Sequence, residues 1–495
     1  MPEKFYITAS LPYTNAPSHI GHLLEFIQTD VLARYNRLLG KDVFFLTGTD
    51  EHGRKNVKAA EKEGKSPQDF VNAISESVRN LISKSGISID AFVRTTDKNL
   101  HWPAVWKIWG KLEDNGDLYK AKYEGLYCVG HEAFIKKSEL KNGLCPDHQI
   151  EPEKITEENY FFKLSKYKNK LEKLIQDDKI KILPVHRKNE TLQLIKDSED
   201  ISFSRPKESI NWGVPVSHDP EHIIYIWIEA LISYLSGLGY ANETEIFKKF
   251  WPPDIQVVGK DIMRFHTIVF PAMLLAAGLE TPKSIYIHGF ITVDGQKMSK
   301  TIGNVVDPFD LIKKYGADPV RYYLLREIPS YEDGDYSEKK FEARYNADLA
   351  NNLGNLVSRV AVLIEKLFNG SFAYSRKYVL KEVDDKVINT WKKYIESLDN
   401  FKLHLALENV FSLADFANLF VDEHKPWALG DNPEHLNEVM MNLIVILLNV
   451  AWLLKPFLPE TSNRIFEVLG ADKDGKSWEE KPFQVRPKIL FPKIQ

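Results

Sequence analysis

Two histidines near the N-terminus are the first residues whose spacing suggests chemistry. His19 and His22 belong to a His-Ile-Gly-His sequence between a short apolar segment, residues 5–9, and an amphipathic segment, residues 23–39. The first segment is typical of a buried parallel strand and the second of a helix. A helix N-terminus favours an anion, and Gly21 allows a ligand to approach the backbone closely. The pattern predicts a phosphate site, but a glycine-containing turn with two surface histidines would show the same residues.

Two lysines much later in the chain could act on the same kind of ligand. Lys297 and Lys300 belong to a Lys-Met-Ser-Lys-Thr sequence that follows an apolar strand predicted over residues 284–288. Lysines on a mobile loop can close over a polyphosphate and neutralise negative charge as it develops. Alone, this segment would be a solvated loop. Together with the His-Ile-Gly-His turn, it indicates a nucleotide site.

A carboxylate follows the second predicted strand. Residues 42–46 are apolar and precede a Gly-Thr-Asp-Glu-His-Gly sequence that contains Asp50. Ligands of doubly wound sheets bind beyond the carboxyl ends of the strands, so Asp50 and the histidine turn are predicted at one edge. Asp50 could orient an amine or a ribose there. The alternative is a turn residue or a helix cap.

The elements that must position these residues divide the chain into four segments. Strands and helices alternate over residues 1–116 and again over residues 202–334, as in doubly wound sheets. Residues 117–201 are polar and rich in predicted strands, and they interrupt this pattern. Residues 335–495 have helical periodicity throughout. The predicted fold class is therefore α/β and doubly wound (Rossmann-like), interrupted by an insertion and followed by an all-α helical bundle.

Individual elements are predicted within these segments. Strands are expected at residues 90–95 and 223–227, and helices at residues 99–115, 190–200, 339–368, 383–399, 401–422 and 434–454. The last of these helices contains two asparagines and stops at a Lys-Pro pair, so we expect a buried helix and no membrane span.

The insertion contains a possible metal site. Cys128 and His131 form one Cys-x2-His pair, and Cys145 and His148 form another. Four such ligands suit tetrahedral zinc with no open position, so one structural zinc per chain is predicted. The alternative is two buried thiols with histidines nearby by chance.

Composition places few limits on function. The chain has 495 residues, a formal net charge of -4, 43% hydrophobic residues and 27% charged residues. This is an ordinary globular mixture, and the charge neither indicates nor excludes a local basic face for RNA. There are only 2 cysteines and the start of the chain does not resemble a signal peptide, so a cytoplasmic protein without disulfides is expected.

The two nucleotide motifs resemble the HIGH and KMSKS motifs of class I aminoacyl-tRNA synthetases. The first is identical, and the second has Thr301 in place of the final serine. Five further segments spread over nearly the whole chain resemble methionyl-tRNA synthetases: SLPYTN, GTDEHG, YIWIEALISY, VVGKDIMRFH and KPW. The resemblance implies that methionine is attached to tRNA(Met), including the initiator tRNA, through a methionyl-adenylate made from ATP with Mg²⁺.

The same resemblance implies roles for individual residues. His19, Gly21 and His22, with Gly259, Asp261 and Lys300, would bind ATP, and Lys297 and Lys300 would act on the departing pyrophosphate. Asp50 would hold the α-amino group of methionine, and Arg205 would face an anion in the active site. The methionine pocket would be lined by Leu11, Tyr13, Trp227, Leu231, Tyr234, Ile262 and His266, although many relatives have proline at the position of Leu231. Aromatic walls suit a thioether, and Tyr or His could donate a hydrogen bond near the sulfur. Asn355, Arg359 and Trp427 would read the anticodon by stacking and by hydrogen bonds to the base edges.

Other assignments are weighed against this one. The insertion has about 85 residues by subtraction, too few for the editing domain of the relatives that use leucine, isoleucine or valine. A cysteine-specific synthetase would have its metal in the amino-acid pocket. A nucleotidyltransferase without tRNA and a non-catalytic RNA-binding paralogue remain as alternatives from other classes. The chain lacks a further tRNA-binding and dimerising domain after the bundle, so we expect a monomer.

Overall fold

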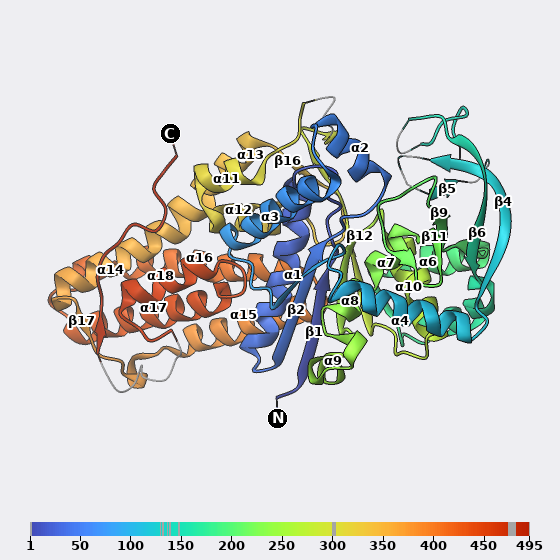
Figure 1. Cartoon of the computed structure of the whole chain (residues 1–495). Coiled ribbons are helices and arrows are strands. Elements are labelled where there is room, and N and C mark those ends of the chain that lie inside the picture. The colour runs from blue at the N-terminus through green and yellow to red at the C-terminus, as the bar shows by residue number, and fades with distance from the viewer. Residues whose placement is uncertain are drawn as a thin grey trace. The chain divides into compact units, whose positions relative to one another are not determined.

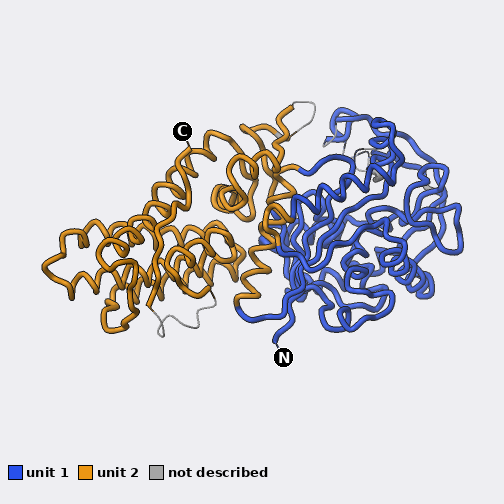
Figure 2. The backbone as a smooth tube through the Cα atoms, turned by 60° about the vertical axis from the view of Figure 1, so that its left-hand side comes forward, with its two compact units in different colours: residues 1–18, 39–82, 88–288 blue, residues 19–38, 83–87, 289–495 orange. Residues whose placement is uncertain are grey.

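The computed structural model describes residues 2–128, 130, 133–135, 137, 140–146, 149–298, 303–473 and 482–494. The chain forms two compact units, which Figure 2 distinguishes by colour. Unit 1 contains residues 1–18, 39–82 and 88–288, and unit 2 contains residues 19–38, 83–87 and 289–495.

A six-stranded parallel sheet forms the centre of unit 1. Its strands, in spatial order, are β3 (Ala91–Arg94), β2 (Asp42–Thr49), β1 (Lys4–Ala9), β12 (Ile255–Gly259), β13 (Ser284–His288) and β7 (Lys181–Leu183). β1 and β12 are buried almost throughout, as expected for parallel strands covered on both faces. The chain order of the strands reverses between β1 and β12, and loops at such a switch point form ligand sites. The predicted α/β class is confirmed.

The strand β7 differs from the prediction because it comes from the range assigned to the insertion. Its Ile182 is buried and pairs with Ile285 of β13, so the insertion supplies an edge strand of the main sheet. Three residues are too few to show a period, which is why the sequence pattern missed this strand. The rest of that range contains a second sheet of β4 (Leu118–Cys128), β5 (Ala133–Ile135), β6 (Glu153–Phe162) and β8 (Ile201–Ser202), and the helices α5 (Lys168–Gln176) and α6 (Val185–Asp197). β4 and β6 are the long paired arrows in Figure 1.

The other helices of unit 1 surround the main sheet. They are α2 (Arg54–Lys62), α4 (His101–Asp114), α7 (Ile226–Leu231), α8 (Ser233–Ser236), α9 (Glu245–Phe250) and α10 (Phe270–Ala276), with a π-helical turn at Phe265–Val269; α3 (Pro67–Lys84) ends just beyond unit 1. A small sheet joins β9 (Ser204–Pro206), β10 (Pro215–Val216) and β11 (Asp219–Ile224).

The strand predicted over residues 223–227 is wrong beyond Ile224. The residue Ile226 begins α7, so Trp227 lies on a helix, and the N–H of Ile228 donates to the carbonyl of Tyr225 at 2.9 Å. A short, continuous apolar run does not distinguish a buried strand from a buried helix.

Unit 2 is mainly helical. Its helices are α1 (Ile20–Leu38), α11 (Pro308–Tyr315), α12 (Ala317–Glu327), α13 (Glu338–Arg344), a π-helical segment (Tyr345–Gly354), α14 (Asn355–Phe368), α15 (Lys381–Asp399), α16 (Leu403–His424), α17 (Pro433–Leu454) and α18 (Pro459–Leu469). Short strands are β14 (Ile291–Val293), β15 (Gln296–Lys297), β16 (Gly334–Tyr336), β17 (Ser371–Phe372) and β18 (Phe483–Gln484). The predicted helical C-terminal region is confirmed. α17 is long and apolar enough to span a membrane, but 72% of its most apolar window is buried inside the protein, as in a core helix.

A buried arginine connects three parts of unit 2. Arg321 of α12 donates from Nη2 to Asp30 of α1 at 2.8 Å and from Nε to the carbonyl of Phe457, after α17, at 2.7 Å. Arg34 also donates to Asp30, at 2.8 Å. A buried charge is tolerated only when it is paired and hydrogen-bonded, so these bonds fix α1 to α12 and to the end of α17.

Candidate active site

The loops after β1 and β2 are joined at the carboxyl edge of the main sheet. The N–H of Asp50 donates to the carbonyl of Pro12 at 3.0 Å, and the N–H of Thr14 donates to the carbonyl of Asp50 at 3.0 Å. This bridge pairs Tyr13 with Asp50, and Asp50 is only 3% exposed. Two residues predicted for the methionine pocket are therefore neighbours on a fixed backbone.

Four aromatic side chains of α7, α8 and the π-helical turn form a surface that we call the aromatic wall. They belong to Trp227, Tyr234, Phe265 and His266. The rings of Trp227 and Phe265 stack with their centroids 4.9 Å apart, and the hydroxyl of Tyr234 lies 2.8 Å from Nε2 of His266. π-helical turns within helices are frequent at functional sites because they reorient side chains locally.

The hydrogen bonds of His266 indicate its tautomer. Its Nδ1 lies 3.0 Å from the carbonyl oxygen of Ile262, which can only accept, so Nδ1 carries the proton. In the neutral ring Nε2 then accepts the hydroxyl proton of Tyr234. Tyr234 therefore directs its hydroxyl proton at His266. In this arrangement the proton is not directed at a thioether, unlike the hydrogen bond considered from the sequence.

The seven residues predicted to line the methionine pocket all lie in unit 1. Leu231, Tyr234 and His266 are buried, and Leu11, Tyr13, Trp227 and Ile262 are half-buried against the same apolar core. A buried floor with a half-exposed rim is typical of a small-ligand site.

The predicted ATP residues of unit 1 follow β12. Gly259 is the last residue of that strand, and Asp261 is exposed two residues later. A Cβ atom on Gly259 would lie 2.7 Å from Oδ1 of Asp261, so a side chain there would displace this carboxylate. The glycine permits a close approach to the backbone at the sheet switch point.

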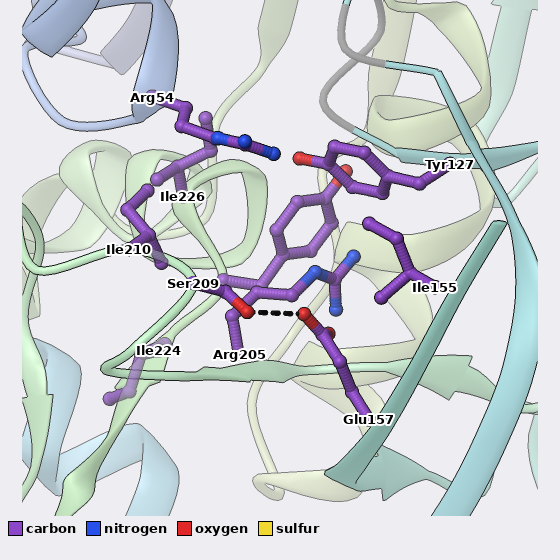
Figure 3. A pocket seen from close by; sticks show the side chains of 10 residues that line it. Arg54, Tyr127, Ile155, Glu157, Arg205, Ser209, Ile210, Ile224 and Ile226 are labelled. Carbon is purple, nitrogen blue, oxygen red and sulfur yellow. Dashed lines mark hydrogen bonds between the residues drawn. The ribbon is translucent and has the colours of Figure 1, made fainter. Parts of the chain in front are cut away.

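Arg205 lines a separate pocket of unit 1, shown in Figure 3. The pocket encloses about 400 Å³ of empty space, counted out to the solvent at its mouth. The guanidinium of Arg205 lies 4.5 Å from the ring centroid of Tyr225, and its Nη1 donates to Oγ of Ser202 at 2.6 Å. Arg54 also lines this pocket, while Glu157 accepts a hydrogen bond from Ser209 at 2.5 Å. Two guanidinium groups and one carboxylate give the pocket a net positive charge.

The His-Ile-Gly-His turn belongs to unit 2 and forms the start of α1. The N–H of Gly21 donates to Nδ1 of His19 at 3.1 Å, and the N–H of His19 donates to Nδ1 of His22 at 3.3 Å. Both Nδ1 atoms therefore accept, which places the proton of each neutral ring on Nε2. Burial lowers the pKa of His19 below its ordinary value, so this ring is neutral at pH 7. The rings stack with centroids 4.0 Å apart, an arrangement that suits two neutral imidazoles with Nε2 donors for an anion.

Of the two predicted lysines, Lys297 lies in β15, within a hairpin of unit 2, and Lys300 lies outside the described residues. The hairpin turn consists of Asp294 and Gly295, both with positive φ, 49° and 75°. This is the turn chemistry of a two-residue hairpin. The lysine segment was predicted as a loop, but its first lysine is in a strand because β14 pairs with it.

The predicted zinc ligands are described only in part. Cys128 and Cys145 are buried and form no disulfide with each other, whereas His131 and His148 lie outside the described residues. Among the described residues no group of three or more candidate ligands forms a metal site. Zinc therefore stays a prediction.

The predicted anticodon residues lie near one another in unit 2. Asn355 and Arg359 are one turn apart on α14, and Asn355 is exposed. The guanidinium of Arg359 lies 5.8 Å from the ring centroid of Trp427 and donates to Asp422 at 2.7 Å. Trp427 is 53% exposed, so its ring is available for stacking on a base.

We give the name aspartate loop to residues 50–52, which follow β2. Its His52 and two residues beyond it, His101 and Glu229, were not identified from the sequence. His52 and His101 both bond the buried carboxylate of Glu229, each at 2.7 Å. Burial acts to raise the pKa of Glu229, but the two histidines outweigh it and hold the pKa below its ordinary value. A glutamate inside the apolar segment Ile-Trp-Ile-Glu-Ala-Leu-Ile was the available signal, because an unpaired charge is rarely buried.

Comparison with known proteins gives one consistent result. Residues 5–155 and 138–361 match the family model described as tRNA synthetases class I (M). The chain is 43% identical to the methionine--tRNA ligase of Caldanaerobacter subterraneus subsp. tengcongensis, over 100% of this chain and 79% of that protein. It is 39% identical to the methionine--tRNA ligase of Rickettsia conorii, over the full length of both. Among solved structures, Mycobacterium tuberculosis methionyl-tRNA synthetase in complex with methionyl-adenylate matches with a TM-score of 0.92 and 35% identity, over 99% of this chain and 100% of that one. The histidine turn, the aspartate loop and the aromatic wall therefore belong to a chain that is a member of the class I methionyl-tRNA synthetase family.

Proposed function

We propose that the residues described above carry out the two steps by which methionine is attached to tRNA. The family reaction is ATP-dependent: methionine and ATP give methionyl-adenylate and pyrophosphate, and the methionyl group then passes to tRNA with release of AMP. In the first step the carboxylate of methionine attacks the α-phosphate of ATP. The protein contributes position and charge stabilisation, without a covalent intermediate on a side chain.

The aromatic wall is the observation on which we base methionine as the amino-acid substrate. Flat, polarizable rings suit a thioether, and Tyr234 and His266 are the buried, hydrogen-bonded members of this wall. Asp50, fixed by its backbone bonds beside Tyr13, would accept hydrogen bonds from the α-amino group of methionine. The side chain and the amino group of the substrate would thus be held by different segments.

The histidines and lysines would act on the phosphates. The Nε2–H groups of His19 and His22 and the N-terminus of α1 suit phosphate oxygens. Lys297 and Lys300 would neutralise charge on the departing pyrophosphate, while Gly259 and Asp261 would bind the ribose. Arg205, in its positively charged pocket, would face an anion of the reaction. Mg²⁺ would bridge the phosphates of ATP, as is usual for this nucleotide.

Recognition of tRNA and the structural metal complete the proposal. The exposed ring of Trp427, beside Arg359 and Asn355, suits stacking on an unpaired anticodon base of tRNA(Met), including the initiator. The buried thiols of Cys128 and Cys145, with His131 and His148 three residues after each, would hold one structural zinc. A monomer in the cytoplasm is the state we propose for the enzyme.

The deciding experiment is amino-acid-dependent ATP–pyrophosphate exchange with each of the twenty amino acids, without tRNA. Exchange with methionine alone is expected, because the aromatic wall and Asp50 are independent of tRNA. Exchange with another amino acid would retain the phosphate chemistry and contradict the pocket assignment. Exchange without subsequent charging of tRNA would favour a nucleotidyltransferase, and no exchange would favour the non-catalytic paralogue.

A further inference from the structure

A buried carboxylate with no role in the proposed chemistry lies behind the candidate methionine pocket. Glu229 of α7 is fully buried, with Oε1 2.7 Å from Nδ1 of His52 and Oε2 2.7 Å from Nε2 of His101. The other ring nitrogen of His101 lies 3.0 Å from Oγ of Ser236. Burying a carboxylate is costly unless its hydrogen bonds are made, and here both oxygens are bonded.

Two of the three bonded side chains, those of His52 and Glu229, come from segments that carry residues of the predicted pocket. His52 follows Asp50 by two residues, and Glu229 lies two residues after Trp227 and two before Leu231 on α7. The bond between His52 and Glu229 therefore joins the loop that would bind the amino group of methionine to the helix that would contact its side chain.

Each residue of the aspartate loop makes hydrogen bonds to a different segment of unit 1. The backbone of Asp50 bonds the loop after β1. The carboxylate of Glu51 accepts from Nε of Arg94 in β3 at 2.7 Å and from Oγ1 of Thr49 at 2.7 Å. The third bond, between His52 and Glu229, reaches α7, the helix that carries Trp227. Loss of the third bond would remove this connection to α7, while other bonds, such as those of Glu51 with Thr95 and Trp212, would still hold the loop.

We infer that Glu229 is a positioning residue for methionine, which fixes the separation between Asp50 and the aromatic wall through His52. This inference rests on the proposed function. A substrate held at both ends binds well only when the two groups keep the right distance, and a shift of 1 Å in such a site can cost up to about 100-fold. The phosphate-binding residues are not part of this connection. The effect is therefore expected in the KM for methionine and not in the KM for ATP.

The primary test is Glu229→Gln in the full-length enzyme, assayed by methionine-dependent pyrophosphate exchange at varied methionine and varied ATP. Glutamine has the shape of glutamate, but it replaces one accepting oxygen by a donor that opposes a histidine N–H. We expect the KM for methionine to rise about tenfold, and the KM for ATP and kcat to change less than about threefold. Equal KM values for methionine in the variant and the wild type would overturn the inference.

Two variants of His52 test whether the hydrogen bond itself matters. His52→Asn retains an N–H near the position of Nδ1, whereas His52→Ala retains none. The KM for methionine is expected to stay close to that of the wild type in His52→Asn and to rise in His52→Ala as in Glu229→Gln. An equal rise in both variants would contradict a role for this bond. If Glu229→Gln does not fold, this pair decides the question.

A control separates positioning from a general loss of stability. Asp117 is also a fully buried carboxylate of unit 1, bonded to Lys166 at 2.6 Å and to Tyr167 at 2.5 Å, and it is not linked to the pocket segments. Asp117→Asn is expected to lower the melting temperature without changing the KM for methionine. A rise of that KM in Asp117→Asn as well would attribute the effect to destabilisation. Absence of methionine-dependent exchange in the wild type would instead refute the proposed function.

Discussion

Backbone contacts set the chemistry of single side chains in this enzyme. In the histidine turn, the N–H of Gly21 donates to Nδ1 of His19, and the N–H of His19 donates to Nδ1 of His22. Each neutral ring therefore presents Nε2–H. The glycine is required for this arrangement, because a Cβ atom on Gly21 would lie 2.9 Å from Cε1 of His19. A side chain at position 21 would therefore displace the ring of His19, which is proposed to bind phosphate.

The variant Gly21→Ala tests this arrangement. We expect adenylate formation in a single turnover to slow by about tenfold or more, because the ring of His19 is displaced, with little change in the KM for methionine. Gly110→Ala is the matched control, since no atom lies within 4 Å of its Cβ position in helix α4. The control is expected to be neutral or to stabilise by about 0.5–1 kcal/mol. An unchanged adenylation rate in Gly21→Ala would contradict the proposed role of the turn.

Residues in recognisable local patterns could be predicted, and residues that act through distant partners could not. The residues Tyr13, Trp227 and Tyr234, predicted for the methionine pocket, were named from the motifs around them, and all three lie in unit 1. Glu229 was missed because its partners lie 177 and 128 residues away in the chain. No local pattern shows that a charge inside an apolar helix is compensated over such distances.

At the scale of elements, the hairpin of β14 and β15 depends on one carboxylate. Oδ1 of Asp335, at the centre of β16, accepts from the N–H of Gly295 at 2.7 Å and from Oγ1 of Thr292 at 2.7 Å. Burial acts to raise the pKa of Asp335, but these hydrogen bonds and Lys340 hold it below its ordinary value. The turn before Lys297 is therefore bonded to the neighbouring strand by an ionised side chain.

Replacement of Asp335 should act on the phosphate step through this hairpin. In Asp335→Ala the turn loses both hydrogen bonds, and we expect adenylate formation to slow by about tenfold, corresponding to roughly 1.4 kcal/mol. The KM for methionine should not change. Asp335→Asn keeps an oxygen that can accept from Gly295, so rapid-quench measurements should find it faster than Asp335→Ala. Equal rates in the two variants would argue against an anchoring role.

Predictions of elements succeeded where the pattern was long. The helices α15, α16 and α17 have 19, 22 and 22 residues, enough turns to show a clear apolar stripe. The short elements β7 and α7 did not follow the prediction. The three residues of β7 are too few to show which sheet they join, and the apolar run of α7 fits a strand or a helix equally well. Tertiary contacts decide the structure of such segments.

At the scale of the molecule, Arg321 determines which segments fold together. It pairs with Asp30 in α1 and also bonds the carbonyls of Pro456 and Ser85, so it joins parts of unit 2 that are hundreds of residues apart. Removal of one partner of a buried ion pair leaves the other charge uncompensated, which is more costly than loss of an exposed pair.

The variant Arg321→Met should therefore be strongly destabilised. We expect a loss of about 3–5 kcal/mol in the free energy of unfolding, measured by urea denaturation. Addition of Asp30→Asn should recover part of this loss, because without Arg321 the buried carboxylate keeps only Arg34 as a charged partner. Lys248→Met, which removes an exposed pair with Glu245, should change stability by less than about 0.5 kcal/mol. A similar small change in Arg321→Met would show that this ion pair does not hold the unit together.

The discontinuous make-up of unit 2 has a consequence for recombination between relatives. Residues 19–38 follow β1 directly in the chain, yet they pack with residues 289–495 and share the buried ion pair of Arg321. A crossover placed after residue 288 would unite one parent's Asp30 with the other parent's Arg321 and would separate two side chains that are paired within each parent's fold. The helical region and α1 should therefore come from the same parent, and a single crossover cannot transfer both together.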